Sequence, residues 1–236
     1  MEIFGVIAAR KGSKGLPKKH LMQINGKPMI GYVIEDCLKS ELLTKLVIST
    51  DDEDLVKLAN SYDIEAVIRP DCFATDTSPI EDALRHAIRT LYGKRVPDIT
   101  VLFQGNIPNR KEGMVDRVIE VLMEDGTLDS AVSVPCPDPH IYSLKTEVNS
   151  LLVPVFEDNE IYRRQDVGGK YYLIDGAVNA IRTKTLMETE GLVGTHLYLG
   201  ERLKGVEQEK EYGLEVDTQK DLELARFYMS KRLTGR

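Results

Sequence analysis

Residues 3–19 read IFGVIAARKGSKGLPKK and join an apolar run to a basic loop. The run 3–9 is short and continuously apolar, which is typical of a strand buried on both faces of a parallel sheet. Every charged residue from 10 to 19 is basic, and the glycines of this loop allow backbone N–H groups to converge on an anion. The loop is therefore a candidate phosphate site, with an ordinary basic surface turn as the alternative.

Strand and helix patterns alternate after this loop. Because such alternation implies right-handed crossovers, we expect an α/β protein with a mostly parallel sheet in a Rossmann-like three-layer α/β/α sandwich. Ligands lie at the carboxyl ends of such strands, so the loops after residues 9, 50 and 103 should share one edge. The expected strands are 45–50, 65–68, 98–103 and 130–134, and the expected helices are 29–38, 52 or 53 to 60, 77–92 and 111–124.

The alternating pattern loosens after Pro135. We expect strands at 151–156 and 171–181, and we interpret residues from about 136 to 180 as a β-rich insertion or dimerisation arm. This arm belongs to a single domain that covers residues 1–236, and it predicts a homodimer.

A closing helix is expected from 218 to 231. Thr218 can cap this helix, and Asp221 stands at its third position, as in a capping box with Asp in place of Glu. His86 is expected on a helix and His196 on a strand, and we assign neither a role.

The chain is acidic, with a net charge of −7 from 31 basic and 38 acidic residues. It lacks the broad positive surface that nonspecific nucleic-acid binding requires, so we expect no nucleic-acid partner. No apolar run is long enough to span a membrane and the first residues do not resemble a secretion signal, which predicts a cytoplasmic protein without membrane contact. The scattered cysteines Cys37, Cys72 and Cys136 indicate small core residues rather than a zinc site or disulfides.

The basic loop resembles the N-terminal motif of the acylneuraminate cytidylyltransferases, which include the CMP-sialic acid synthetases and are related to the CMP-Kdo synthetases. Further segments resemble motifs of this family in the expected order: VISTDD at 47–52, RP at 69–70 with DTSP at 76–79, and EVDTQKDL at 215–222. Together the motifs span nearly the whole chain. The resemblance implies a fold of the nucleotide-diphospho-sugar transferase type and a CTP-dependent nucleotidyltransferase.

In this family the anomeric hydroxyl of an acid sugar attacks the α-phosphorus of CTP, and pyrophosphate leaves. The resemblance implies that Arg10, Ser13 and Lys19 contact the triphosphate. Because negative charge builds on the phosphoryl oxygens during such a transfer, Arg10 and Lys19 are the predicted catalytic residues. The implied nucleotide site consists of Ala8, Ala9, Arg10, Gly12, Ser13, Lys19, Asp76 and Gln104.

Glu215 and Asp217 occupy the places of the family's metal-binding carboxylates, which implies Mg²⁺ as the cofactor. On alternate residues of one strand end, both side chains would project to the same side and could share the ion. Asp217 would equally suit the start of the following helix, where the helix dipole favours an acid.

Several positions depart from the family pattern. His20 stands where Asn is usual, and Glu215 stands where Asp is usual. Residues 104–110 read QGNIPNR, so the neutral Asn106 replaces an acid that binds metal in the Kdo enzymes.

The expected sugar pocket departs as well, because residues 174–177 read IDGA in place of PNGA. Asp175 would repel an anionic sugar unless Arg163, Arg164 or Lys170 compensates. Arg163 and Arg164 could clamp a substrate carboxylate or form a surface pair. The predicted substrate-binding residues are Asn106, Arg163, Arg164 and Asp175.

The preferred function is transfer of CMP from CTP to an acid sugar, either sialic-acid-like or another 3-deoxy-keto acid, with release of pyrophosphate. A second alternative keeps nucleotidyl transfer but changes the acceptor to a different sugar or a non-sugar molecule, which the altered segments 104–110 and 174–177 favour. A third is a catalytically inactive nucleotide-binding protein with a regulatory or assembly role. Asn106 and Glu215 support the third, whereas the retained Lys19 opposes it.

Overall fold

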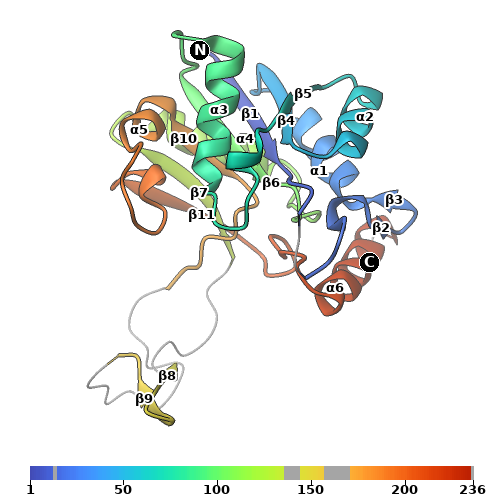
Figure 1. Cartoon of the computed structure of the whole chain (residues 1–236), viewed down its shortest axis with the longest axis vertical. Coiled ribbons are helices and arrows are strands. Elements are labelled where there is room, and N and C mark those ends of the chain that lie inside the picture. The colour runs from blue at the N-terminus through green and yellow to red at the C-terminus, as the bar shows by residue number, and fades with distance from the viewer. Residues whose placement is uncertain (13–14, 136–143, 157–170, 235–236) are drawn as a thin grey trace.

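A computed structural model describes residues 1–12, 15–135, 144–156 and 171–234 of the chain. Its centre is a seven-stranded sheet with the order β11-β7-β10-β6-β1-β4-β5 (Figure 1). Neighbouring strands of this sheet pair in parallel except at β10, which is antiparallel to β6 and to β7. The strands are β1 Ile3–Ala8, β4 Lys45–Thr50, β5 Glu65–Ile68, β6 Ile99–Gln104, β7 Ser130–Pro135, β10 Asn179–Arg182 and β11 Leu203–Gln208.

Two helical layers cover the sheet, which confirms the expected sandwich. Helices α1, α2 and α4 pack against one face, and α3 and α5 pack against the other. Because successive strand residues face opposite sides, β1 gives Ile7 to the first core and Phe4 to the second. The helices are α1 Met29–Leu38, α2 Glu53–Ser61, α3 Ile80–Tyr92, α4 Met114–Glu124 and α5 Thr183–Glu188, with 3₁₀ helices η1 Lys19–Leu21, η2 Asp71–Phe73 and η5 Leu197–Leu199.

The last helix, α6 Gln219–Thr234, packs beside a small hairpin of β2 Gln23–Ile24 and β3 Lys27–Pro28 (Figure 1). A third apolar cluster fills this contact and includes Leu16 of the basic loop and Val216. The cluster therefore holds the basic loop close to the segment that precedes α6.

Several expected elements begin and end where the sequence predicts. The strands at 45–50 and 65–68 and the helix at 29–38 match the expected ranges. Thr218 caps α6, because its Oγ1 accepts from the Asp221 backbone N–H over 3.3 Å, and its own backbone N–H donates to Asp221 Oδ2 over 2.8 Å. Within the described ranges no helix combines the length and the apolar character needed to cross a membrane. The cytoplasmic location stays a prediction.

The loops that follow β1, β4 and β6 meet at one edge of the sheet, as expected. Lys11 donates its backbone N–H to Asp51 Oδ1 over 2.7 Å, which joins the first two loops. Gly105 donates its backbone N–H to the Ala8 carbonyl over 3.0 Å, which joins the third loop to the end of β1. This edge is where parallel sheets bind their ligands.

Some local expectations are wrong. The long strand expected at 171–181 reduces to β10, because Gly176 turns the chain with a φ of +72 just before it. His196 has a φ of +58 and precedes η5 instead of lying in a strand. Cys37 is buried as expected, but Cys72 is exposed and so is not a core residue.

A separate antiparallel hairpin of β8 Lys145–Val148 and β9 Leu151–Pro154 lies away from the central sheet (Figure 1). Its turn residues Asn149 and Ser150 have φ values of +52 and +65, as a two-residue hairpin turn requires. Leu152 on this hairpin is 74% exposed. The role of this region as a dimerisation arm stays a prediction.

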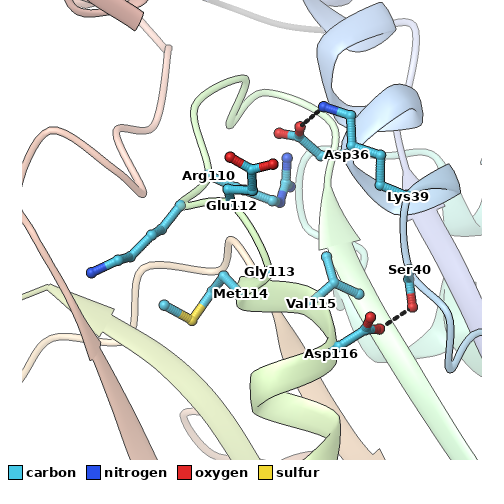
Figure 2. A pocket seen from close by; sticks show the side chains of 10 residues that line it. Asp36, Lys39, Ser40, Arg110, Glu112, Gly113, Met114, Val115 and Asp116 are labelled. Carbon is cyan, nitrogen blue, oxygen red and sulfur yellow. Dashed lines mark hydrogen bonds and ion pairs between the residues drawn. The ribbon is translucent and has the colours of Figure 1, made fainter. Parts of the chain in front are cut away.

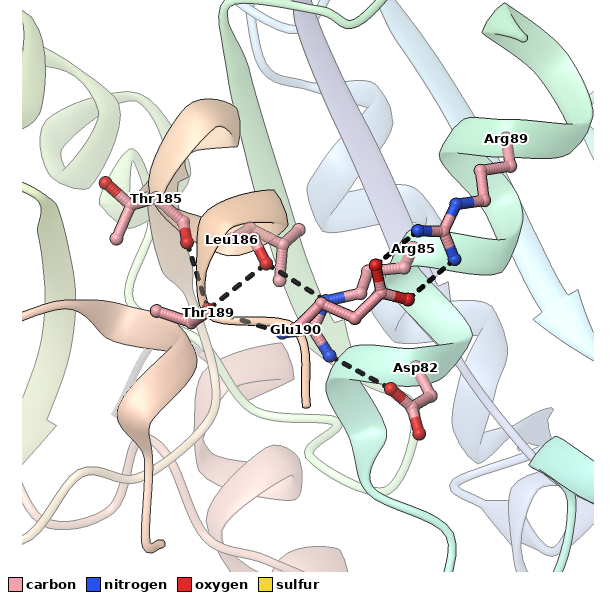
Figure 3. A network of polar contacts seen from close by, with 7 residues as sticks. All are labelled: Asp82, Arg85, Arg89, Thr185, Leu186, Thr189 and Glu190. Carbon is pink, nitrogen blue, oxygen red and sulfur yellow. Dashed lines mark hydrogen bonds and ion pairs between the residues drawn. The ribbon is translucent and has the colours of Figure 1, made fainter. Parts of the chain in front are cut away.

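An arginine network ties α3 to α5 and the turn that follows it (Figure 3). Arg85, whose side chain is 4% exposed, donates to the Leu186 carbonyl over 3.0 Å and to Asp82 Oδ1 over 2.9 Å. Arg89 pairs through both of its terminal nitrogens with Glu190, at the surface. Only Arg85 is shielded from water, so the two arginines should differ in their contribution to stability.

Replacing Arg85 by methionine should lower the free energy of unfolding by about 3 kcal/mol, because the buried carbonyl and Asp82 lose their donor. The same change at Arg89 should cost less than about 1 kcal/mol, since exposed ion pairs contribute little. Urea unfolding of both variants measures the difference. Equal losses would show that burial does not set the contribution of this network.

Candidate active site

The basic loop leaves β1 and runs along the carboxyl edge of the sheet. Lys18 has a φ of +55 and precedes η1, which carries Lys19 to the edge. Gly15 passes so close to the segment 213–217 that a Cβ at this position would collide with the carbonyl oxygen of Asp217. The loop and this segment therefore lie directly against each other.

A pocket of about 180 Å³ opens at this edge. Its walls come from the ends of β1 and β6, the basic loop, the segment 69–80 before α3, and the segment before α6. The pocket therefore gathers residues that are far apart in the sequence. The lining residues are Ala8, Arg10, Lys19, His20, Arg69, Phe73, Thr75, Asp76, Ser78, Ile80, Gln104, Asn106 and Glu215.

Two cations of the basic loop are held by carboxylates at this pocket. Arg10 Nη2 lies 2.8 Å from Asp76 Oδ1, and Lys19 Nζ lies 2.5 Å from Asp217 Oδ1. The side chain of Lys19 is 14% exposed, whereas that of Asp217 is 52% exposed. A phosphate group that enters the pocket would compete with these carboxylates for the two cations.

Asn106 joins the two predicted metal ligands. Its Nδ2 donates to Glu215 Oε1 over 3.0 Å and to Asp217 Oδ1 over 3.2 Å. Val216 donates its backbone N–H to the Asn106 carbonyl over 2.9 Å, which fixes the segment against the loop after β6. Residues 214–217 are not a strand, so the expected strand end is wrong. The carboxylates come together because Asn106 contacts both.

The paired carboxylates suit a hard cation. Glu215 and Asp217 offer oxygen ligands, and Mg²⁺ is often held by one or two carboxylates together with substrate phosphates. Among the residues that the structure describes, no group of three or more His, Cys, Asp or Glu side chains could hold a metal ion. Mg²⁺ bound here would therefore draw its further ligands from a phosphate and from water.

Asp175 lies outside the pocket lining, in a network of hydrogen bonds. Its Oδ1 accepts from Ser133 Oγ over 2.6 Å and from the Ala177 backbone N–H over 2.9 Å, and its Oδ2 accepts from Gln208 Nε2 over 2.6 Å. Burial raises the pKa of this carboxyl above its usual value, although the hydrogen bonds oppose the shift. The network ties β7 and β11 to the turn before β10, and a role of Asp175 in substrate binding stays a prediction.

The pocket also contains buried residues that the sequence did not single out as ligand contacts. Arg69 donates through Nη2 to the Ser49 carbonyl over 2.8 Å, and burial lowers its pKa to about 10. His20 is 5% exposed, and burial together with the nearby cations Lys19 and Arg69 lowers its pKa to about 3. Both residues lie in segments that resemble family motifs, but no local sequence pattern indicates that they are buried.

Seven of the fourteen predicted site residues line the pocket. Those that line it are Ala8, Arg10, Lys19, Asp76, Gln104, Asn106 and Glu215. Ala9 is buried, and Gly12 is exposed with open space around it. The predicted residues Ser13, Arg163 and Arg164, together with Lys170 and Cys136, lie outside the described residues.

The burial of His20 should make the free energy of unfolding depend on pH. The unfolded chain binds a proton at this residue below its ordinary pKa of about 6.5, whereas the folded chain does not bind one until about pH 3. The contribution of His20 to the free energy of unfolding is therefore fully present above pH 6.5. It is lost as the pH falls, and the loss is about 2 kcal/mol at pH 5. In His20→Asn the free energy of unfolding should no longer show this decrease between pH 7 and pH 5. Urea unfolding at pH 7 and pH 5 measures it, and equal pH dependence in both proteins would contradict the assignment.

The arrangement of residues in the pocket agrees with the proteins to which this chain is similar. The sequence profile of a family described as cytidylyltransferase matches residues 4–226. The N-acylneuraminate cytidylyltransferase of Escherichia coli is 26% identical over 95% of this chain and 51% of that protein, so the chain spans about half the length of this relative. The CMP-N,N'-diacetyllegionaminic acid synthase of Legionella pneumophila is 29% identical over 80% of this chain and 82% of that protein.

A solved structure shares the fold. A CMP:2-keto-3-deoxy-manno-octonic acid synthetase, solved in complex with CTP, superposes with a TM-score of 0.75 at 22% identity, and the match covers 98% of this chain and 100% of that one. At this identity the likeness establishes the fold alone. It agrees with the mostly parallel sheet and its two helical layers.

Proposed function

The chain belongs to the cytidylyltransferase family, and from this premise we propose that it transfers CMP from CTP to an acid sugar and releases pyrophosphate. The observation that carries the proposal is the pocket itself. Arg10, Lys19 and the carboxylate of Glu215 line it, and Lys19 also pairs with the adjoining carboxylate of Asp217; cations beside carboxylates are the combination that phosphoryl transfer uses. Relatives named for sialic and legionaminic acids support an acid sugar as the acceptor.

In the proposed reaction the acceptor hydroxyl forms a bond to the α-phosphorus of CTP, and the bond from this phosphorus to the pyrophosphate oxygen breaks. The proton of the hydroxyl passes to water, and the electron pair of the broken bond stays on the pyrophosphate oxygen. Arg10 and Lys19 exchange their carboxylate partners for phosphate oxygens. Since charge on these oxygens is greatest in the transition state, both cations contribute mainly to kcat.

We propose that Glu215 and Asp217 hold Mg²⁺ with the nucleotide. A bound magnesium ion would neutralise charge on the phosphate oxygens. Asn106 keeps the two carboxylates in place through its amide, and it brings no charge of its own.

An anionic acceptor is compatible with this pocket. Asp175 would repel it only if its charge faced the ligand, but three donors surround this carboxylate and it does not line the pocket. The proposal keeps Arg163 and Arg164 as the partners of the acceptor carboxylate.

The homodimer belongs to the same proposal. The hairpin β8–β9 exposes the paired residues Val148 and Leu151, at 49% and 68%, and a second copy would cover such an apolar surface. Analytical ultracentrifugation of the full chain tests this, with twice the mass of one chain as the expected result.

Pyrophosphate release tests the function. CTP, ATP, GTP and UTP are each combined with Mg²⁺ and with N-acetylneuraminate or Kdo, with acceptor-free mixtures as controls. We expect release that requires both CTP and one acid sugar. A second series replaces the acid sugars by other sugars and by non-sugar acceptors. Release only in that series would favour the altered-acceptor function, and binding of CTP without turnover for any acceptor would favour the inactive nucleotide-binding protein.

A further inference from the structure

Arg110 is a fully buried arginine in the loop between β6 and α4, with 1% of its surface exposed. Its guanidinium donates to three backbone carbonyls. Nε donates to Ala177 over 2.8 Å, Nη1 to Ile107 over 2.6 Å, and Nη2 to Gln104 over 3.2 Å. The group also lies 5.7 Å from the centre of the Phe103 ring. One side chain therefore fixes the backbone on both sides of the pocket's inner wall.

The backbone segments that Arg110 joins also contact each other directly. Gln104, which lines the pocket, donates its backbone N–H to the Gly176 carbonyl over 3.3 Å. A Cβ at Gly176 would collide with the side-chain amide of Gln104, so the amide lies directly against the Gly176 backbone. Asn106 lies two residues further along the same loop and also lines the pocket.

We propose that Arg110 is the positioning residue of the nucleotide pocket: by holding the carbonyls of Gln104, Ile107 and Ala177 it sets Gln104 and Asn106 in the geometry that CTP requires. The inference rests on the proposed function, because CTP is the ligand it invokes. Arginine suits this role because its planar fork offers donors in fixed directions from three nitrogens, whereas a lysine ammonium carries all its donors on one nitrogen.

A cavity of about 290 Å³ adjoins this arginine, between the end of α1 and the start of α4 (Figure 2). Asp36, Lys39 and Ser40 form one side of it, and the first residues of α4 form the other. A small guanidinium compound can therefore reach the place of the Arg110 side chain when that side chain is removed.

Arg182 provides a matched control. It too donates to backbone carbonyls, to Leu122 over 2.6 Å, to Leu128 over 3.4 Å and to Asp125 over 3.5 Å. It ties the end of α4 to β10 and does not line the pocket. Lysine at either position removes a similar set of hydrogen bonds, so a purely structural role predicts the same behaviour for both variants.

The experiment measures the Kd for CTP by calorimetry and the Tm of the unaltered chain, Arg110→Lys and Arg182→Lys. We expect both variants to lose Tm, and Arg110→Lys at least as much as Arg182→Lys, because Arg110 is fully buried and Arg182 is partly buried. Arg110→Lys should weaken CTP binding roughly tenfold, because a small misplacement of ligand contacts is costly, whereas Arg182→Lys should stay within about twofold. Methylguanidine should restore CTP binding to Arg110→Ala.

Two further outcomes complete the test. If Arg110→Lys does not fold, Gly176→Ala should give the same loss of CTP affinity, because it displaces Gln104 while Arg110 remains. Equal CTP binding by the unaltered chain, Arg110→Lys and Gly176→Ala would overturn the inference alone. Absence of CTP binding by the unaltered chain would overturn the proposed function, and the inference with it.

Discussion

Replacing Asp217 by asparagine is expected to lower kcat for cytidylyl transfer by roughly 10³-fold, equivalent to about 4 kcal/mol of transition-state stabilisation. The change keeps the shape of the side chain but removes its charge. Lys19 loses the negative charge that lies 2.5 Å away, and the proposed magnesium site loses one of its two carboxylates. The fold should survive, because Asp217 is 52% exposed.

Asp54→Asn is the matched control for this variant. Asp54 also pairs with a lysine of the basic loop, Lys18, over 3.0 Å, but neither residue lines the pocket. Its kcat should stay within about twofold of the unaltered chain, since an exposed ion pair contributes little. Steady-state kinetics at saturating CTP compares the two variants, and near-normal turnover in Asp217→Asn would remove Asp217 from the metal site.

The second large effect is expected at Lys19. Lys19→Ala should lower kcat by roughly 10²- to 10³-fold, because the ammonium would face phosphate oxygens whose charge grows in the transition state. The KM for CTP should change much less, since a contact of this kind is strongest in the transition state.

Lys18→Ala serves as the control for Lys19. The two lysines are adjacent, but the side chain of Lys18 is 59% exposed and that of Lys19 is 14% exposed. The control should turn over almost normally. An effect of Lys19→Ala confined to the KM of the acceptor would mean that Lys19 belongs to the acceptor half of the pocket.

The parallel part of the fold is predictable from the sequence, and the physical reason is burial. Strands β1 and β4 carry continuous apolar runs, and the helix α1 between them has a clear apolar face. The hydrophobic pattern of these three elements is therefore strong. The edge strand β11 gives no such signal. It reads LKGVEQ, most of it is exposed, and the charges of Lys204 and Glu207 along it are typical of protected sheet edges.

Only the site residues that lie in family motifs could be predicted from the sequence. The contact between Lys19 and Asp217 joins residues 198 positions apart, which no local pattern can reveal. The order of the family motifs supplied both residues. The burial of His20 and the hydrogen bonds that three donors make to Asp175 depend on how separate elements pack, so neither could be predicted from the sequence.

The central claim is that an acceptor hydroxyl attacks the α-phosphorus of CTP in the pocket of Lys19. It is tested most directly with an acid sugar carrying ¹⁸O at its anomeric hydroxyl and with mass spectrometry of the products. Attack by this hydroxyl places one ¹⁸O in the CMP-sugar and none in the pyrophosphate. A CMP-sugar without the label, or pyrophosphate that carries it, would show that a different oxygen attacks the phosphorus.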